Sequence, residues 1–287
     1  MTRTRTVTVD GLTFSEDGWT SPDGYTLWLD DIPGWKDGPA VHRERAARMN
    51  AHGEFSERGW RDARLVTIQG DATCPSEEVT ALAEQQLAAV LADGLAGVLE
   101  VTDTATVPMS CGTYLFSEPK IGYKNDTTLT YQIQFICPKP RKYGAPVNAV
   151  TGVSTAGGGL EYPLGDPLDY GAAGNPGTVT LVNTGTADTA PAFTVSAGTT
   201  DMPFGFSITH VQSGNRLVYS DPVLLGQTVR LDTSDGSVLL EGYADRSAKL
   251  TVREWTRLAR NTSGTWLFEA TGSTGAQMIA EVRPAWW

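Results

Sequence analysis

The stretch Phe135-Ile-Cys-Pro-Lys-Pro-Arg-Lys-Tyr143 marks the point where a first domain is predicted to end. Before it, apolar and polar residues alternate from Leu129 to Cys137, which is typical of a strand with one buried face. Pro138 and Pro140 then stop the strand, because proline lacks the N–H group that a neighbouring strand needs. The chain therefore changes its organisation near residue 143.

The residues on either side of this point divide the chain into three parts. Residues 144–176 are rich in Gly, Ala and Pro without periodicity, and a second series of short strands is predicted from Thr178. We expect a first domain at 1–143, a Gly/Pro-rich linker at 144–176 and a second domain at 177–287. A chain of 287 residues is long enough for two domains that each bury a core.

In the first domain the sequence predicts β-structure with one packed α-helix. Asp10-Gly11 between alternating segments predicts an opening β-hairpin. The helix is predicted at 76–93, with Ser76 as N-cap, acidic residues in the first turn and an apolar stripe at helical spacing. Residues 34–55 contain several chain-breaking residues, so we expect a long irregular excursion there or one short helix near Arg43 to Met49.

The second domain has no helical signal of comparable strength. Short apolar runs alternate with turn residues such as Asn183-Thr184-Gly185 and Asp235-Gly236. Regular short strands with this punctuation predict an antiparallel β-sandwich. The whole chain is therefore expected to be mainly β.

Composition excludes several classes of function. The net charge of −11 disfavours nucleic-acid binding. The first residues contain no apolar signal segment, and no apolar run is long enough to span a bilayer, so we expect a protein made in a cytoplasm without membrane insertion. Three widely spaced cysteines, Cys74, Cys111 and Cys137, predict reduced thiols and neither a metal site nor a structural disulfide.

A search for catalytic motifs gives no candidate. Three histidines are present, without a metal-ligand spacing, and there is no nucleophile elbow or phosphate-binding loop. We therefore expect no enzyme activity and no cofactor; a hydrolase with a carboxylate pair is the weakest alternative. Trp255 and Trp266 are candidates for stacking on sugars, although packing in the core or at a domain edge is the preferred interpretation.

The order of these features resembles the distal tail protein family of long-tailed, non-contractile bacteriophages, in the form called a minor tail protein in phages of actinobacteria. The resemblance covers nearly the whole chain and departs from the family at the glycine-rich insert 151–159. It rests on Ile32-Pro33-Gly34, His52-Gly53-Glu54-Phe55, Cys137-Pro138-Lys139-Pro140-Arg141-Lys142-Tyr143, Asn175-Pro176-Gly177, Asn183-Thr184-Gly185-Thr186, Asp232-Thr233 and the final Ala280-Glu281-Val282-Arg283-Pro284-Ala285-Trp286-Trp287.

The resemblance implies a homo-hexameric ring at the tail tip. A belt domain of sheet and helix would close the ring, and a galectin-like sandwich would project outward. Its implied partners are the tail tube protein, the tail-tip hub, the receptor-binding proteins and the tape measure protein, with DNA only in transit. The alternative is a carbohydrate-binding module protein that attaches the tail to host glycans.

The charge segregation has two interpretations: each run is simply solvated surface, which is preferred for any single run, or two sets of residues have roles in such a ring. Residues 65–119 contain acidic residues and no Lys or Arg, and acids that face the lumen would keep DNA from adhering. The lumen candidates are Asp71, Glu77, Glu78, Glu84 and Asp93. The candidates for pairing with a neighbouring subunit are Arg58, Arg61 and Arg64.

Overall fold

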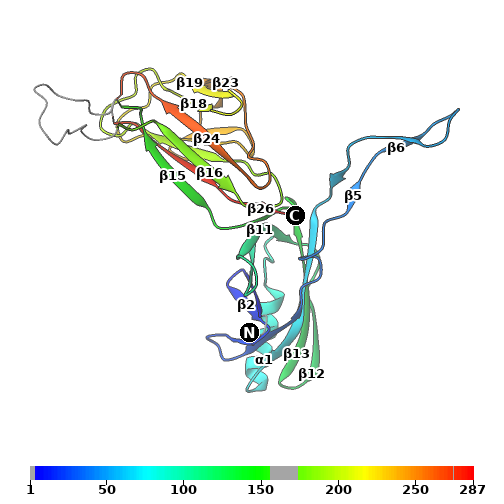
Figure 1. Ribbon diagram of the computed structural model, residues 1–287. Coiled ribbons are helices and arrows are strands. Elements are labelled where there is room, and N and C mark those ends of the chain that lie inside the picture. The colour runs from blue at the N-terminus through cyan, green and yellow to red at the C-terminus, as the bar shows by residue number, and fades with distance from the viewer. Residues whose placement is uncertain (1–3, 156–173, 274) are drawn as a thin grey trace, which may run out of the picture. The chain divides into compact units, whose positions relative to one another are not determined.

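The chain forms two compact units, which we describe separately. A computed structural model describes residues 4–155, 174–273 and 275–287 (Figure 1). One unit comprises Met1–Gly144 together with Trp287, and the other comprises Ala145–Trp286. Both are built mainly of strands, and each has its own cluster of buried apolar side chains. The mainly β fold with one packed helix is therefore confirmed.

The first unit is a large, mostly antiparallel sheet with one helix against it. Its strands follow the order β12-β13-β9-β4-β2-β1-β10-β11-β14, and β11 also pairs with β13, so the sheet curls back on itself. The sheet strands are β1 (Arg5–Val9), β2 (Leu12–Ser15), β3 (Trp19–Thr20), β4 (Thr26–Asp31), β9 (Arg64–Thr73), β10 (Gly97–Asp103), β11 (Met109–Leu115), β12 (Lys120–Asn125), β13 (Thr128–Cys137) and β14 (Lys142–Tyr143).

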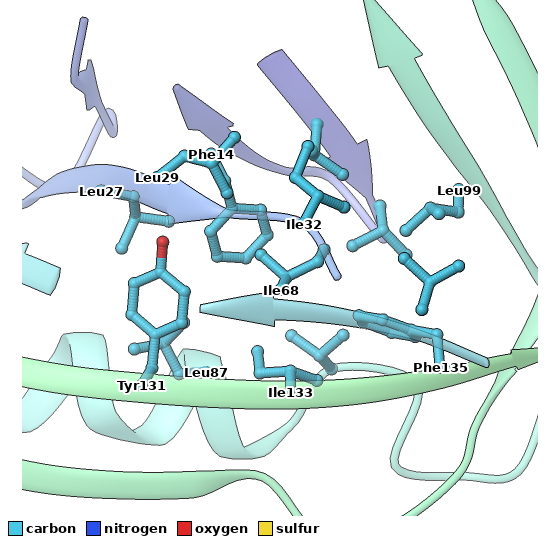
Figure 2. Packing of buried hydrophobic residues seen from close by; sticks show 14 of the residues in the cluster. Phe14, Leu27, Leu29, Ile32, Ile68, Leu87, Leu99, Tyr131, Ile133 and Phe135 are labelled. Atoms are coloured by element: carbon cyan, nitrogen blue, oxygen red, sulfur yellow. The ribbon is translucent and has the colours of Figure 1, made fainter. Parts of the chain in front are cut away.

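Alternation along β13 gives the sheet one buried face. Leu129, Tyr131, Ile133, Phe135 and Cys137 are all buried, as the sequence pattern predicts. Their register against β9 is continuous over ten residue pairs, which fixes the same face on both strands. Figure 2 shows this core, in which side chains from β13 pack with others from the opening hairpin, β4, β9 and the helix.

The opening hairpin and the helix start form as predicted. Asp10 and Gly11 have φ angles of 50° and 79°, the positive values that a tight turn between β1 and β2 requires. The hydroxyl of Ser76 accepts a hydrogen bond from the N–H of Val79 at 3.4 Å and caps helix α1 (Glu77–Ala88). This bond satisfies one of the donors left free at a helix start.

Helix α1 ends five residues earlier than predicted. The backbone N–H of Leu91 donates to the Asp10 carboxylate at 2.9 Å, and Leu91 has a φ angle of 49°. This tertiary hydrogen bond to the opening hairpin thus replaces the helical bond that the N–H of Leu91 would otherwise donate to the carbonyl four residues earlier. Val90 and Leu91 remain buried beyond the helix end, which explains why the apolar stripe continued to look helical.

The prediction of a short helix near Arg43 to Met49 is wrong. The chain forms a long two-stranded ribbon there instead, which extends away from the sheet (Figure 1). Its strands are β5 (Val41–His42), β6 (Arg45–Ala47), β7 (Glu54–Ser56) and β8 (Trp60–Arg61).

The second unit is the predicted antiparallel β-sandwich. One sheet has the order β15-β25-β17-β20-β21-β22 and the other β16-β24-β18-β19-β23, with a short 3-10 helix, η1 (Ser247–Lys249), before β23. The strands are β15 (Val147–Gly152), β16 (Thr178–Asn183), β17 (Ala192–Ser196), β18 (Phe206–His210), β19 (Arg216–Tyr219), β20 (Thr228–Asp232), β21 (Ser237–Leu240), β22 (Ala244–Asp245), β23 (Leu250–Arg253), β24 (Thr262–Glu269) and β25 (Gln277–Val282), followed by the short β26 (Ala285–Trp286).

The predicted linker at 144–176 contributes to the sandwich, so its description as a linker needs correction. Strand β15 pairs with β25 over six residues, from Val147 opposite Val282 to Gly152 opposite Gln277. The N–H of Thr155 also donates to the carbonyl of Asn175 at 2.9 Å. The second series of strands therefore begins at Val147 rather than Thr178. Residues 156–159 of the glycine-rich insert lie outside the described residues.

Candidate assembly interface

The ribbon formed by residues 41–61 is the least buried part of the first unit. At its base Val41 lies opposite Arg61, and further out Arg45 lies opposite Ser56. Every residue of its four short strands is exposed. The ribbon therefore has two solvent-facing sides along its length.

Large apolar side chains cover much of this ribbon. Val41, Met49, Phe55 and Trp60 are between 54% and 98% exposed. Arginines lie over the two rings: the Arg48 guanidinium carbon is 5.0 Å from the Phe55 ring centre, and the Arg58 guanidinium carbon is 4.8 Å from the Trp60 ring centre. Arginine and aromatic residues are enriched at protein interfaces, so this surface is suited to a protein partner.

The ribbon has few stabilising contacts of its own. Arg45 and Glu54 form an exposed ion pair at 3.7 Å, and His42 Nδ1 lies 2.6 Å from the Asp62 carboxylate. Such exposed pairs contribute at most about 1 kcal/mol each. A two-stranded ribbon alone is marginally stable in water, so a partner that covers its apolar residues would stabilise it.

Arg64 fixes the root of the ribbon. Its side chain is only 1% exposed and donates to the backbone carbonyls of Gly34, Trp35 and Asp37 at 2.6–3.2 Å. Its Nε donates to the Pro140 carbonyl at 3.0 Å. One arginine therefore connects the segment that leads into the ribbon with the segment after β13.

Lys142 supports the same root from β14. Its Nζ donates to the Trp35 carbonyl at 3.1 Å and lies 5.4 Å from the centre of the Trp35 ring. Burial, with a further contribution from Arg64, lowers the pKa of Lys142 to about 8. The two cations hold Trp35, which is itself 7% exposed, in a fixed position.

The structure separates the three arginines that the sequence suggested as contacts to a neighbouring subunit. Arg64 is buried within its own unit, so it cannot pair with a neighbour, and that part of the prediction needs correction. Arg58 is exposed on the ribbon. Arg61 donates to the Pro39 carbonyl at 3.1 Å, and its guanidinium carbon lies 4.9 Å from the Trp287 ring centre. Arg58 thus remains the most accessible candidate.

A polar groove of about 470 Å³ lies on the sheet face opposite the core. It is lined by side chains of β4, β9, β12 and β13, among them Gln69, Lys120 and Gln132. Asp71 and Lys124 form an ion pair in this groove at 2.6 Å. Polar side chains and balanced charge therefore characterise this face.

The five candidate lumen acids do not form one surface. Asp71 lies opposite Thr130 in the sheet, on the face away from the core. Tyr123 lies opposite the buried Leu129 and donates to Glu84 of helix α1 at 2.5 Å, so Glu84 lies on the other side of the sheet. The remaining three acids, which are exposed, lie at or just beyond the ends of the same helix: Glu77, Glu78 and Asp93.

The two candidate sugar-stacking tryptophans are also in different environments. Trp266 is 2% exposed and packs in the sandwich core, 5.7 Å from the ring of Phe193 and 5.0 Å from that of His210. It therefore packs in the core, as the preferred interpretation of the sequence has it, and cannot act as a sugar-stacking platform. Trp255 is partly buried and lies beside Gly236 in the β20–β21 turn.

Residues 4–155, 174–273 and 275–287 contain neither a metal-ligand cluster nor a helix suited to span a membrane. No group of three or more His, Cys, Asp or Glu side chains is arranged there to hold a metal ion. In the same part of the chain, no helix is both long and apolar enough to cross a membrane.

A two-unit, mainly β protein is the class that this architecture defines, and solved structures share the fold. The SPP1 Dit (gp 19.1) protein, described as a paradigm of the hub adsorption apparatus in phages that infect Gram-positive bacteria, superposes with a TM-score of 0.66 at 12% identity over 99% of both chains. Chains of the phage P2 baseplate in its activated conformation superpose at TM-scores of 0.52 with calcium and 0.51 with strontium, at 11% and 10% identity over 98% of both chains.

These similarities concern the fold, because the identities are low. They extend across both units, so the pairing of the two folds in one chain is shared as well. No protein-family profile and no curated protein sequence matches the chain.

Proposed function

We propose that this protein is a structural component of a phage tail tip, a distal tail protein that forms a ring between the tail tube and the tip. The observation that carries the proposal is the match of both units, over 99% of the chain, to SPP1 Dit. The motif order found in the sequence is an independent argument for the same family. The protein acts by assembly rather than catalysis.

The ring in this proposal is a homo-hexamer that the ribbon helps to close. Residues 41–61 expose apolar and arginine side chains that their own subunit leaves uncovered. A neighbouring copy that covers Phe55 and Trp60 would bury them and order the ribbon. Identical contacts around a closed ring satisfy every copy at once.

In this ring the polar sheet face, rather than helix α1, forms the channel wall. Strand β12 is at one end of the strand order, and an edge strand can pair with a strand of the next subunit. Sheets joined in this way make a continuous wall, lined here by uncharged polar groups, by Asp30 and Lys120 and by the Asp71–Lys124 pair. DNA would pass such a hydrated wall without a strongly basic surface to retain it.

The partners in this proposal are the tail tube protein on one side and the tail-tip hub with receptor-binding proteins on the other. The tape measure protein and DNA pass through or end at the ring. The protein would be assembled in the host cytoplasm and reside in the virion tail tip.

The test is the mass of the purified protein by light scattering, with electron microscopy of the largest species. We expect a ring with six times the subunit mass of 30.7 kDa and a central hole. Because assembly can require a template, the measurement is repeated with tail tube protein present. A monomer under both conditions would contradict the ring.

A ribbon variant tests how the ring closes. Replacing residues 43–59 by Asn-Gly joins β5 to β8 in a short hairpin and removes Phe55. We expect an unchanged melting temperature and no ring, because the ribbon is exposed in its own subunit.

A milder comparison uses matched charge changes. The double variant R48A/R58A should weaken ring formation, whereas the control R257A/R260A removes two exposed arginines from the second unit and should not. Full ring formation by both ribbon variants would show that the ribbon is not the contact while leaving the ring itself intact.

A further inference from the structure

Two buried cysteines meet at the seam where the first sheet curls back on itself. Cys111 of β11 and Cys137 of β13 are 2% and 0% exposed, and their Sγ atoms lie 2.7 Å apart. The structure has both as free thiols. Twenty-six residues of sequence separate them, and tertiary structure brings them together.

Strand register explains the meeting. Tyr114 lies opposite Ile136 and Leu115 opposite Phe135, so Cys111 and Cys137 lie on the same face, two residues apart along the pairing. The Thr113 hydroxyl donates to the Ile136 carbonyl at 3.1 Å and holds the two strands together between the cysteines.

The surroundings favour a reactive sulfur in this pair. The two sulfurs share a hydrogen bond in which either thiol is able to donate, and this bond lowers the pKa of Cys137, as does the positive charge of Arg64. The same hydrogen bond and burial raise the pKa of Cys111. One member is therefore predisposed to be the thiolate and the other to be the thiol that reacts second.

We propose that Cys111 and Cys137 are an oxidation site at which a small peroxide converts the two thiols into a disulfide that joins β11 to β13. This inference is independent of the proposed function, since it concerns the chemistry of the first unit alone. It also differs from the sequence prediction, which treated the cysteines as separate reduced residues.

The reaction balances with one equivalent of hydrogen peroxide. The Cys137 thiolate attacks one peroxide oxygen, the O–O bond breaks, and the other oxygen takes a proton and leaves as water, which gives a sulfenic acid. The Cys111 sulfur then attacks the Cys137 sulfur and loses its proton, and the sulfenic oxygen leaves as a second water. Both sulfurs are oxidised by one electron each, and the peroxide is reduced by two.

Cys74 provides an internal control. It directly follows β9, is partly exposed and has no thiol partner among the described residues. If exposure decides which thiol is oxidised, Cys74 reacts first. If the closeness of two thiols decides, Cys111 and Cys137 are oxidised and Cys74 stays reduced.

The experiment treats the folded, full-length protein with hydrogen peroxide, blocks free thiols with an alkylating reagent under denaturing conditions, and measures intact mass and linked peptides. We expect one free thiol instead of three, a single Cys111–Cys137 link, and full recovery of three thiols after reduction. The variant C74S should give the same link. The variants C111S and C137S should each form no link within the chain.

Two outcomes would overturn the proposal. One is the survival of both Cys111 and Cys137 as free thiols after Cys74 has been oxidised in the folded protein. The other is a link that forms only when the chain is unfolded in denaturant, which would show that the native fold does not promote it. Circular dichroism of each cysteine variant checks that the fold is retained.

Discussion

Arg64 and Lys142 place two positive charges in the interior of the first unit, and the backbone stabilises both. Arg64 contacts four carbonyl groups and Lys142 contacts one, with Trp35 between them. Carbonyl oxygens carry partial negative charge and are fixed in the backbone, so they stabilise a buried cation without a carboxylate. These residues keep the ribbon root and the segment after β13 in one arrangement.

Replacing Arg64 by Ala should therefore destabilise the protein strongly. The change removes a side chain that is only 1% exposed, together with its hydrogen bonds to the carbonyls of Gly34, Asp37 and Pro140, and we expect a loss of at least about 3 kcal/mol in unfolding free energy. Urea unfolding measures it. R64K should lose less, since it keeps the charge but not the planar set of donors.

The exposed Arg58 is the matched control for this change. R58A removes the same side chain from the ribbon surface, and its unfolding free energy should stay within about 0.5 kcal/mol of the wild type. Equal effects of R58A and R64A would show that Arg64 is not an anchor.

Lys142 should make stability depend on pH in the alkaline range. Its pKa is about 8 in the folded protein and 10.5 in the reference state, so between these values the unfolded chain binds more protons. Stability therefore rises with pH over this window. The variant K142M lacks the titration, so the unfolding free energy of wild type minus variant should increase from about pH 8 to pH 10.5 and be constant at lower pH.

A decrease of this free-energy difference with rising pH would mean that protonated Lys142 is more stable in the folded protein than in water. Comparing each protein by urea unfolding at several pH values cancels the other titrations, which both chains share. A difference that is flat across the whole range would contradict the lowered pKa.

Residue roles were less predictable than residue positions. Alternation identified the buried face of β13. Residue type alone, however, does not distinguish the buried Arg64 from the exposed Arg58, or the buried Trp266 from the partly buried Trp255. Charged side chains are rarely buried unless they have partners, and here the partners of Arg64 are carbonyls up to 76 residues away. No pattern in a single sequence marks such contacts.

At the scale of elements, local signals predicted what local interactions stabilise. The turn at Asp10-Gly11 and the cap at Ser76 depend on neighbouring residues, and both are present. The early end of helix α1 depends on the Asp10 carboxylate, 81 residues from Leu91, and was missed. Helix ends are set by tertiary hydrogen bonds as much as by propensity.

The ribbon was missed because it lacks the usual strand signals. Residues 43–49 contain Arg, Glu and Ala, which favour helices, and only short segments pair across the ribbon. Pairing also requires a partner strand beyond the tip, where Gly53 has a φ angle of 96°. A surface designed for a partner need not carry the alternation of a half-buried strand.

At the scale of the whole molecule, each unit buries its own core, and the boundary at residue 144 lies next to the stretch with which the sequence changes character. Buried apolar residues of both sheets meet inside the sandwich, as the Phe193 and Trp266 rings show. A domain with a continuous core of this kind is expected to fold without the rest of the chain.

The isolated second unit should therefore fold, provided that its first strand is included. Residues 145–286 contain β15, which pairs with β25 over six residues and brings Val153 into the core. A fragment of residues 177–286 begins at the boundary that the sequence suggested. It lacks β15 and Val153 and exposes the edge of β25. We expect cooperative thermal unfolding of the first fragment, and a lower melting temperature or aggregation of the second. Equal melting temperatures would mean that β15 contributes little to the sandwich and that the boundary near residue 177 was adequate for folding.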